Sequence, residues 1–261
     1  MIKINKFSVL KRMYKMAYEN HWGHLASSTS ALPIMIDIYE NMTDRDYFVL
    51  SKGHAGMALY ALLQELGYNP NTKYPYPVFQ PTEGINITGG SLGHGLPFSA
   101  GLAFGLKLKE ESNPHKSNVY CLVGDGELQE GTTWETYLLM YKFHLKNLFV
   151  TIDANDWQAC KPCYDIPATE IYNKLGFQCV NSEKGMYCSL TKGRPFLHTF
   201  YMSEEDYKTV LKDIEIQENK QKELIGAMET RNKNYNIFKE THKNTLKDRI
   251  EKIKIKNTKR K

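Results

Sequence analysis

One stretch in the middle of the chain constrains the fold most, because it reads as a strand, a helix and a second strand. A continuous apolar run, Val119–Val123, enters Gly124-Asp125-Gly126-Glu127; a helical pattern follows; and a second apolar run, Leu148–Ile152, leads to Asn155. Thirty residues separate Asp125 from Asn155, enough for one crossover that returns the second strand parallel and adjacent to the first. A carboxylate and an amide are therefore expected to meet at one edge of a parallel sheet.

The rest of the chain up to about residue 200 predicts an α/β fold. Its apolar pattern alternates between helical spacing and short continuous runs, as in a mostly parallel central sheet with helices on both faces. Helices are predicted over residues 7–19, 30–41, 54–66, 92–109 and 128–143, and further strands over 47–50, 177–180 and 195–200. From residue 203 onward, polar residues at helical spacing predict a helical, lysine-rich extension. We therefore divide the chain into a domain of residues 1–202 and an extension of residues 203–261.

Charge and composition limit the classes of partner and compartment. Residues 243–261 hold nine of the 34 Lys and Arg but only two of the 29 Asp and Glu, so the rest of the chain is mildly acidic despite the net charge of +5. A solvated helix end explains this tail better than a nucleic-acid site does. No apolar run approaches the roughly 18 residues of a membrane span. Cys121 and Cys179 lie in apolar runs, as reduced thiols do, and we expect a cytoplasmic protein.

The glycine-rich segment around Asp125 has the character of a diphosphate cradle. Glycines on both sides permit a tight turn and close approach of the backbone to a ligand, and a following helix presents free amides to negative charge. Asp125 and Asn155, with a backbone carbonyl such as that of Trp157, supply the hard oxygen ligands that Mg²⁺ or Ca²⁺ prefers. Since Gly-Asp-Gly alone occurs in many loops, the spacing to Asn155 carries the argument.

Two irregular stretches flank this core. Residues 70–86 contain four prolines and form a loop much longer than the usual median of about five residues, which indicates a functional or covering segment. Residues 155–167 follow a buried strand at the edge where ligands bind in parallel sheets. Within them, Cys160 and Cys163 have the spacing of a metal or redox pair, but no second pair lies at a suitable distance, and a plain loop is favoured.

Four short motifs that contain glycine follow one another along the chain. They are Gly23-His24, Ser51-Lys52-Gly53-His54-Ala55, Gly89-Gly90-Ser91-Leu92-Gly93-His94-Gly95, and Gly124-Asp125-Gly126-Glu127-Leu128-Gln129-Glu130-Gly131 with Trp134-Glu135 just beyond. With Asn155 about thirty residues after Gly-Asp-Gly, the chain resembles the transketolase family of thiamine diphosphate enzymes over about residues 8–158. The resemblance is weak near Gly193-Arg194-Pro195.

The resemblance implies a set of cofactor ligands. Asp125, Asn155 and the Trp157 carbonyl would hold magnesium or calcium, and the Gly126 amide and His54 would contact the diphosphate of thiamine diphosphate. The cofactor-binding set also includes two residues beside the cofactor rings and two of the glycine-rich segment: Gly90, Leu92, Gly124 and Glu127. For His54, a helix-capping role is the structural alternative.

The resemblance also implies roles for two further histidines at the reacting centre. His24 would lie near the reacting carbon and donate to a substrate oxygen as negative charge develops; a partly buried loop histidine is the alternative. His94 stands where ordinary transketolases have glutamine, and it either contacts the acceptor or caps a helix. We count His24, His54 and His94 as the candidate catalytic residues.

The family activity implies a partner. Transketolases carry a separate pyrimidine-binding domain whose glutamate activates the cofactor, and no residue here matches it. The chain resembles the amino-terminal half of a split transketolase, which is active in an α2β2 heterotetramer with a carboxyl-terminal subunit. The expected reaction moves a two-carbon ketol unit from a ketose to an aldehyde or keto-sugar acceptor, and the substrates would be sugars or sugar phosphates.

Two alternatives to that reaction remain open. One is a subunit of a 2-oxo acid decarboxylase or of a deoxyxylulose-phosphate-synthase-like enzyme. The other is a non-catalytic scaffold subunit that binds the partner without turnover. Asp125, Asn155, His54 and His24 occur together, which argues against a scaffold.

Overall fold

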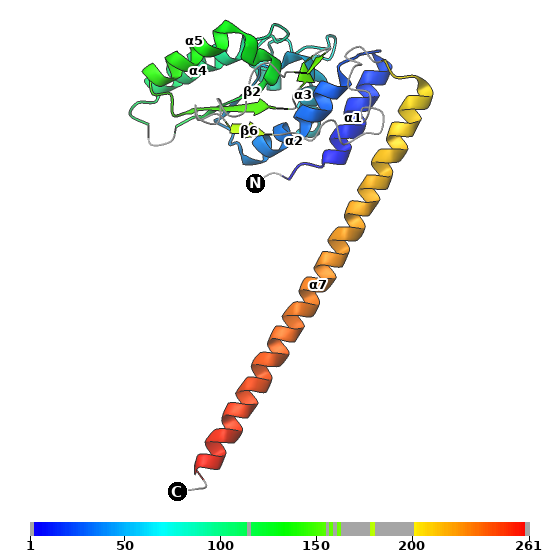
Figure 1. Ribbon diagram of the computed structural model, residues 1–261, viewed down its shortest axis with the longest axis vertical. Coiled ribbons are helices and arrows are strands. Elements are labelled where there is room, and N and C mark those ends of the chain that lie inside the picture. The colour runs from blue at the N-terminus through cyan, green and yellow to red at the C-terminus, as the bar shows by residue number, and fades with distance from the viewer. Residues whose placement is uncertain are drawn as a thin grey trace. The chain divides into compact units, whose positions relative to one another are not determined.

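The computed structural model describes residues 3–113, 116–154 and 201–233 with their side chains; elsewhere it describes the backbone of three short strands between residues 157 and 180 and of a helix that continues to residue 258. The strand predicted over residues 195–200 lies outside the described residues. The elements, drawn in Figure 1, are α1 (Lys6–Glu19), α2 (Leu25–Asn41), β1 (Tyr47–Leu50), η1 (Gly53–Ala55), α3 (Gly56–Glu65), η2 (Pro81–Glu83), α4 (Gly95–Lys109), β2 (Val119–Gly124), η3 (Asp125–Gln129), α5 (Gly131–Lys142), β3 (Leu148–Asp153), β4 (Trp157–Gln158), β5 (Lys161–Pro162), β6 (Gln178–Val180) and α7 (Glu204–Thr258).

The central sheet has the order β1-β2-β3-β6, and every pair in it is parallel. Its register aligns Val119 of β2 with Tyr47 of β1 and with Leu148 of β3, and Gly124 pairs with Asp153. The ends of β1, β2 and β3 therefore open onto the same edge. The α/β fold and the crossover between β2 and β3 are confirmed.

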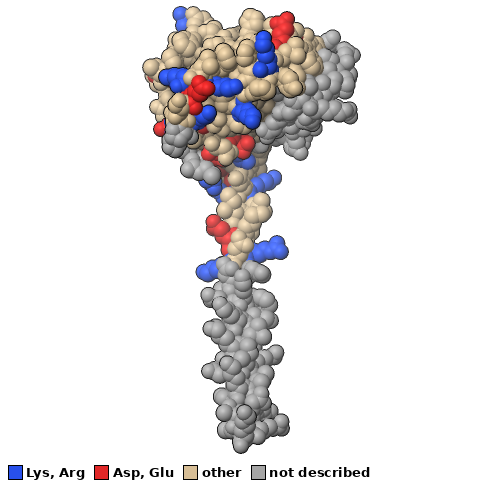
Figure 2. All heavy atoms as spheres, turned by 90° about the vertical axis from the view of Figure 1, so that its left-hand side faces the viewer, with Lys and Arg blue, Asp and Glu red and all other residues tan. Residues whose placement is uncertain are grey.

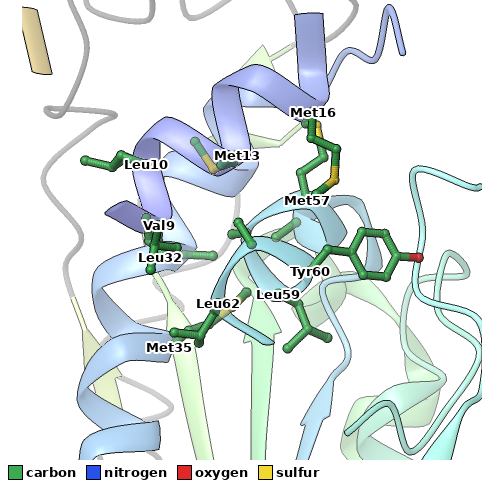
Figure 3. Packing of buried hydrophobic residues seen from close by; sticks show 14 of the residues in the cluster. Val9, Leu10, Met13, Met16, Leu32, Met35, Met57, Leu59, Tyr60 and Leu62 are labelled. Carbon is green, nitrogen blue, oxygen red and sulfur yellow. The ribbon is translucent and has the colours of Figure 1, made fainter. Parts of the chain in front are cut away.

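Alternate residues of the strands face two separate apolar layers, because successive side chains of a strand point to opposite faces. Phe48, Leu50 and Leu122 belong to a cluster with α1, α2 and α3, whereas Val49 and Cys121 belong to another with α4 and α5. Figure 1 shows α4 and α5 on one side of the sheet and α2 on the other. Figure 3 shows the side chains of α1, α2 and α3 gathered between these helices. Burial on both faces explains why the strands read as continuous apolar runs.

Helix α2 begins at Leu25, five residues before the predicted start at Ser30. One hydroxyl group of its polar first turns bonds to carbonyls of the helix itself: Thr29 Oγ1 donates to the carbonyls of Leu25 and Ala26. Such a bond lets Thr remain helical without an outside partner. The earlier start places His24 directly at the helix N-terminus.

The starts of α3, α4 and α5 also differ from prediction. Each begins two or three residues later, at Gly56, Gly95 and Gly131, and a 3₁₀ turn or a bend precedes it. In each case the residues before the helix belong to one of the resemblance motifs. The 3₁₀ turn or bend formed by these motif residues therefore takes the place of the predicted first turn of each helix.

The chain divides into two compact units, Met1–Ile214 and Glu215–Lys261. Within the first, Tyr207 of α7 stacks on Tyr18 with ring centroids 4.7 Å apart, and Val210 and Ile214 are fully buried. Within the second, Lys, Arg, Asp and Glu side chains lie on the described surface of the helix (Figure 2), and Lys222 pairs with Glu218 at 2.9 Å. The helical extension is confirmed, whereas the boundary between residues 202 and 203 stays a prediction. Among the described residues, no helix is both long and apolar enough to span a membrane.

Candidate cofactor-binding site

The carboxyl ends of β1, β2 and β3 carry the residues that the sequence singles out. Asp125 follows β2 directly and is 7% exposed. Asn155 comes two residues after the last residue of β3 and lies outside the described residues. Trp157 begins β4, and this strand packs against η3, whose first residue is Asp125. The fold therefore brings the segments of two predicted metal ligands together.

A backbone amide in the turn after β2 orients the Asp125 carboxylate. The Gly126 amide donates to Asp125 Oδ1 at 2.9 Å. Within the described ranges, no three His, Cys, Asp or Glu side chains gather as a metal cluster. The Asp125 carboxylate is a hard oxygen donor of the kind that Mg²⁺ and Ca²⁺ prefer.

Glu127 is completely buried, and its carboxylate joins three loops. Ser51 Oγ donates to Oε1 at 2.6 Å, the Gly93 amide donates to Oε1 at 3.0 Å, and the Gly124 amide donates to Oε2 at 2.8 Å. Removal from water raises the pKa of Glu127, and the bonds from Ser51, Gly124 and Gly93 oppose that shift. The carboxylate thus links the loop after β1, the glycine-rich turn before α4 and the end of β2.

A second buried network lies next to the first. Lys52 Nζ is 2.6 Å from Asp153 Oδ2, and Ser30 Oγ donates to the same oxygen at 2.7 Å. Lys52 Nζ also donates to Ser30 Oγ at 3.2 Å. These contacts join the ends of β1 and β3 to α2. Because Ser51 bonds to Glu127, two buried carboxylates hold adjacent residues of the loop that leads to His54.

The structure brings His24 and His54 together, with ring centroids 6.0 Å apart. His54 lies in η1 and is half-buried; the N-cap of α3 is Ala55, so His54 is not its capping residue. His24 is the N-cap of α2 but makes no capping bond with its side chain. Its backbone is left-handed, with φ 62° and ψ 22°, a conformation that costs a residue other than glycine about 1–3 kcal/mol.

The glycine-rich turn 89–95 presents its backbone to the same edge. A Cβ on Gly53 would lie 2.9 Å from Gly90 Cα, so only glycine lets this turn contact the loop that carries His54. Gly93 has φ +74°, and a Cβ there would lie 2.8 Å from Glu130 Cβ. Leu92 is exposed and available as an apolar wall.

His94 occupies the N-cap position of α4 and is exposed, and its side chain makes no capping hydrogen bond. The helix-capping alternative therefore has no bond to support it. Contact with an acceptor stays a prediction.

Tyr76 is a site residue that the sequence motifs do not single out. Its hydroxyl lies 3.1 Å from His24 Nε2, and the ring centroids are 5.7 Å apart. The Tyr76 ring also lies beside Gly90, within 3.6 Å of where a Cβ would be. The only sequence signal is the length of the 70–86 loop, which indicates function without naming a residue.

The comparisons with known proteins agree with this geometry. Residues 36–160 match the family described as "Transketolase, thiamine diphosphate binding domain". That match includes His54, the glycine-rich turn and Asp125, whereas His24 precedes it. Just under half of the chain therefore matches the thiamine diphosphate-binding domain of transketolases.

Two curated relatives and one solved structure illustrate how far the likeness to transketolases extends. It is 33% identical to an apulose-4-phosphate transketolase subunit of Actinobacillus succinogenes over 58% of this chain and 61% of that protein. It is 26% identical to "6-deoxy-6-sulfo-D-fructose transketolase subunit SqwG" of Clostridium sp. over 74% of this chain and 88% of that protein. A transketolase from Leishmania mexicana shares the fold with TM-score 0.61 at 17% identity, over 83% of this chain and 45% of that chain. The chain spans between 45% and 61% of the first three curated relatives.

Proposed function

We propose that this chain is the diphosphate-binding subunit of a split, thiamine diphosphate-dependent transketolase. The enzyme would transfer a two-carbon ketol unit from a ketose to an aldehyde or keto-sugar acceptor. The observation that carries the proposal is the convergence of Asp125, His54 and His24 at the ends of β2, β1 and the start of α2, in a chain that matches this transketolase domain. The names of two relatives, which call them transketolase subunits, support the division into subunits.

The residues present fit an anionic cofactor held through a divalent cation. Asp125 offers a carboxylate at the sheet edge, next to β4 with Trp157, and the nearby Lys52 charge is matched by Asp153. Asp125, Asn155 and the Trp157 carbonyl would hold Mg²⁺ or Ca²⁺, and the diphosphate would lie against Gly126 and His54. When bound, thiamine diphosphate supplies the nucleophilic carbon and the electron sink for breaking and forming a carbon–carbon bond beside a carbonyl.

The work of this chain would be to bind, orient and donate protons. The His54 imidazole would donate to a diphosphate oxygen, where the anion favours its protonated form. The His24 imidazole would donate to the oxygen of the reacting carbonyl, where it gains most as negative charge develops. Leu92 and Gly90 would form an apolar wall and an open backbone beside the cofactor rings.

A partner subunit is supported by an apolar surface on α4 and α5. Leu108, Leu138, Leu139 and Tyr141 are exposed there, between 45% and 74% of their full area. Exposed apolar side chains that gather on one face mark interaction sites, and Leu138 and Tyr141 lie three residues apart on α5, where side chains are neighbours. We infer that this face binds the carboxyl-terminal subunit, which carries the pyrimidine-binding domain, in an α2β2 assembly that works in the cytoplasm.

Reconstitution tests the proposal. The isolated chain should show negligible ketol transfer, and addition of a pyrimidine-domain subunit with thiamine diphosphate and Mg²⁺ should restore it. Asp125→Asn should abolish metal-dependent uptake of the cofactor by the complex, as measured by calorimetry. Robust transfer by the chain alone would contradict its assignment to a split enzyme. Turnover of a 2-oxo acid instead of a ketose, or an assembled complex without turnover, would favour a decarboxylase or a scaffold.

A further inference from the structure

The 70–86 loop delivers one side chain into the predicted reaction site. Of this loop, Tyr76 is the residue whose hydroxyl meets a candidate catalytic histidine, at 3.1 Å from His24 Nε2. Its ring packs beside Gly90 of the glycine-rich turn. Tyr76 is therefore in contact with two of the motifs that define the site.

The loop holds Tyr76 in place through its backbone. Tyr60 Oη, on the buried helix α3, donates to the Tyr76 carbonyl at 2.7 Å. The Gly89 amide donates to the Pro77 carbonyl at 2.8 Å. Pro75 and Pro77 also pack closely against Gly56, where a Cβ would lie 2.6 Å from the Pro75 carbonyl oxygen. These contacts fix the loop at the residue that meets His24, although the loop is long.

His24 needs such support more than most residues. Its backbone is in the left-handed region, its side chain makes no capping bond to α2, and it sits between the rings of His54 and Tyr76. A tyrosine hydroxyl both donates and accepts, so it can pair with Nε2 in either tautomer of the imidazole. The hydroxyl can therefore fix the ring without dictating its protonation.

We propose that Tyr76 is a positioning residue that holds the His24 imidazole in the orientation in which it meets substrate. The inference rests on the proposed function. Tyr76 acts through His24, and its loss should lower turnover without weakening the binding of thiamine diphosphate.

A double-mutant cycle in the reconstituted complex tests this role. Tyr76→Phe keeps the ring and the backbone bonds and removes only the hydroxyl, so kcat should fall about fivefold, the effect of one hydrogen bond. The dissociation constant of thiamine diphosphate and the Tm should stay at the wild-type values. In a His24→Ala background the same change should alter kcat less than about twofold, because the group through which it acts is gone. Tyr74→Phe, a matched change at an exposed tyrosine of the same loop, should leave kcat unchanged.

A spectroscopic readout separates this inference from the proposed function. In the full chain labelled with ¹⁵N-histidine, Tyr76→Phe should shift the Nε2 signal of His24, whereas Tyr74→Phe should not. The His24 signal is assigned by its loss in His24→Ala. An inactive wild-type complex would contradict the proposed function, but the NMR experiment would still test the role of Tyr76. An unchanged His24 signal, a wild-type kcat for Tyr76→Phe, or equal losses of kcat in both backgrounds would overturn the positioning role.

Discussion

The Lys52 ammonium lies 2.6 Å from the Asp153 carboxylate, and both side chains are almost wholly removed from water. Ser30 of α2 donates to the same carboxylate oxygen. The pair joins the ends of two strands, one leading to His54 and the other to Asn155. Two predicted ligands of the cofactor and its metal therefore depend on one buried ion pair for their relative position.

Replacement of Lys52 by methionine should lower the free energy of unfolding by about 3–5 kcal/mol, because it leaves the Asp153 carboxylate buried without its counter-charge. Denaturation in urea, followed by circular dichroism, measures the change. Lys15→Met provides the control: Lys15 pairs with Glu19 on the surface of α1, and such pairs contribute about 0.3–0.5 kcal/mol.

The double change Lys52→Met with Asp153→Leu should recover much of the lost stability, since it removes both charges together. Recovery would show that the cost comes from the unpaired carboxylate and not from lost packing. A single Lys52→Met variant within about 1 kcal/mol of wild type would contradict the role given to this pair.

Glu127→Ala should destabilise the chain and loosen the cofactor site. The substitution leaves the Ser51 hydroxyl and the Gly93 and Gly124 amides without their acceptor, and each unsatisfied buried donor costs about 1–3 kcal/mol. We expect a loss of more than about 3 kcal/mol, measured by urea denaturation.

Two further variants test whether the lost hydrogen bonds of Glu127 cause the loss of stability. Glu127→Gln should lose less stability, because the amide oxygen still accepts from Ser51 and Gly93. Glu111→Ala, at an exposed glutamate, should change stability by less than about 0.5 kcal/mol. Equal losses for the Ala and Gln variants would argue against the hydrogen bonds as the cause.

The sequence specified the sheet well because its strands are buried on both faces. Val119–Val123 and Leu148–Ile152 read as unbroken apolar runs, and the structure places them side by side with Asp125 at the shared edge. The starts of helices were predicted less well. Leu25, Gly95 and Gly131 begin helices where local hydroxyl bonds or a preceding turn decide the first residue, and apolar spacing does not record either.

The candidate site was only partly visible in the sequence for a related reason. Motifs identify residues such as His24, His54 and Asp125 because each stands in a recognisable local pattern. Contacts between distant segments have no such pattern: the pairing of Lys52 with Asp153 spans 101 residues, and that of Tyr76 with His24 spans 52. The inward direction of the Glu127 side chain likewise depends on loops that meet only in the folded chain.

Negative charges introduced on the surface of α5 should weaken binding of the proposed carboxyl-terminal subunit without unfolding this chain. Leu138 and Tyr141 lie three residues apart on one exposed face of α5, and three-residue spacing places side chains as neighbours on a helix. Leu138→Glu with Tyr141→Glu should raise the dissociation constant of the complex at least tenfold, measured by sedimentation or calorimetry, while the Tm of the isolated chain stays constant. Leu224→Glu, an exposed apolar change on α7, serves as the control. Unaltered affinity in the α5 variant would exclude this face as the interface.

The Cys121 thiol should react very slowly with alkylating reagents in the folded chain. Burial raises the pKa of its thiol to about 12, although a hydrogen bond with Ser99 opposes the shift. Since the thiolate is the reactive form, alkylation of Cys121 by iodoacetamide between pH 7 and 9 should be at least about a hundredfold slower in the folded chain than in the unfolded chain. In the urea-unfolded chain, the same cysteine should react faster as the pH rises through its ordinary pKa of about 8.5.

The raised pKa of Cys121 also makes the stability of the chain depend on pH. Because the folded pKa lies above the unfolded one, the contribution of the protonated thiol is fully present below about pH 8.5 and is lost as the pH rises toward 12. Peptide mapping by mass spectrometry follows Cys121 separately from the other cysteines. Labelling of Cys121 in the native chain at nearly the rate of the unfolded chain would show that the α4 layer over β2 opens to solvent far more readily than a fully packed sheet face allows.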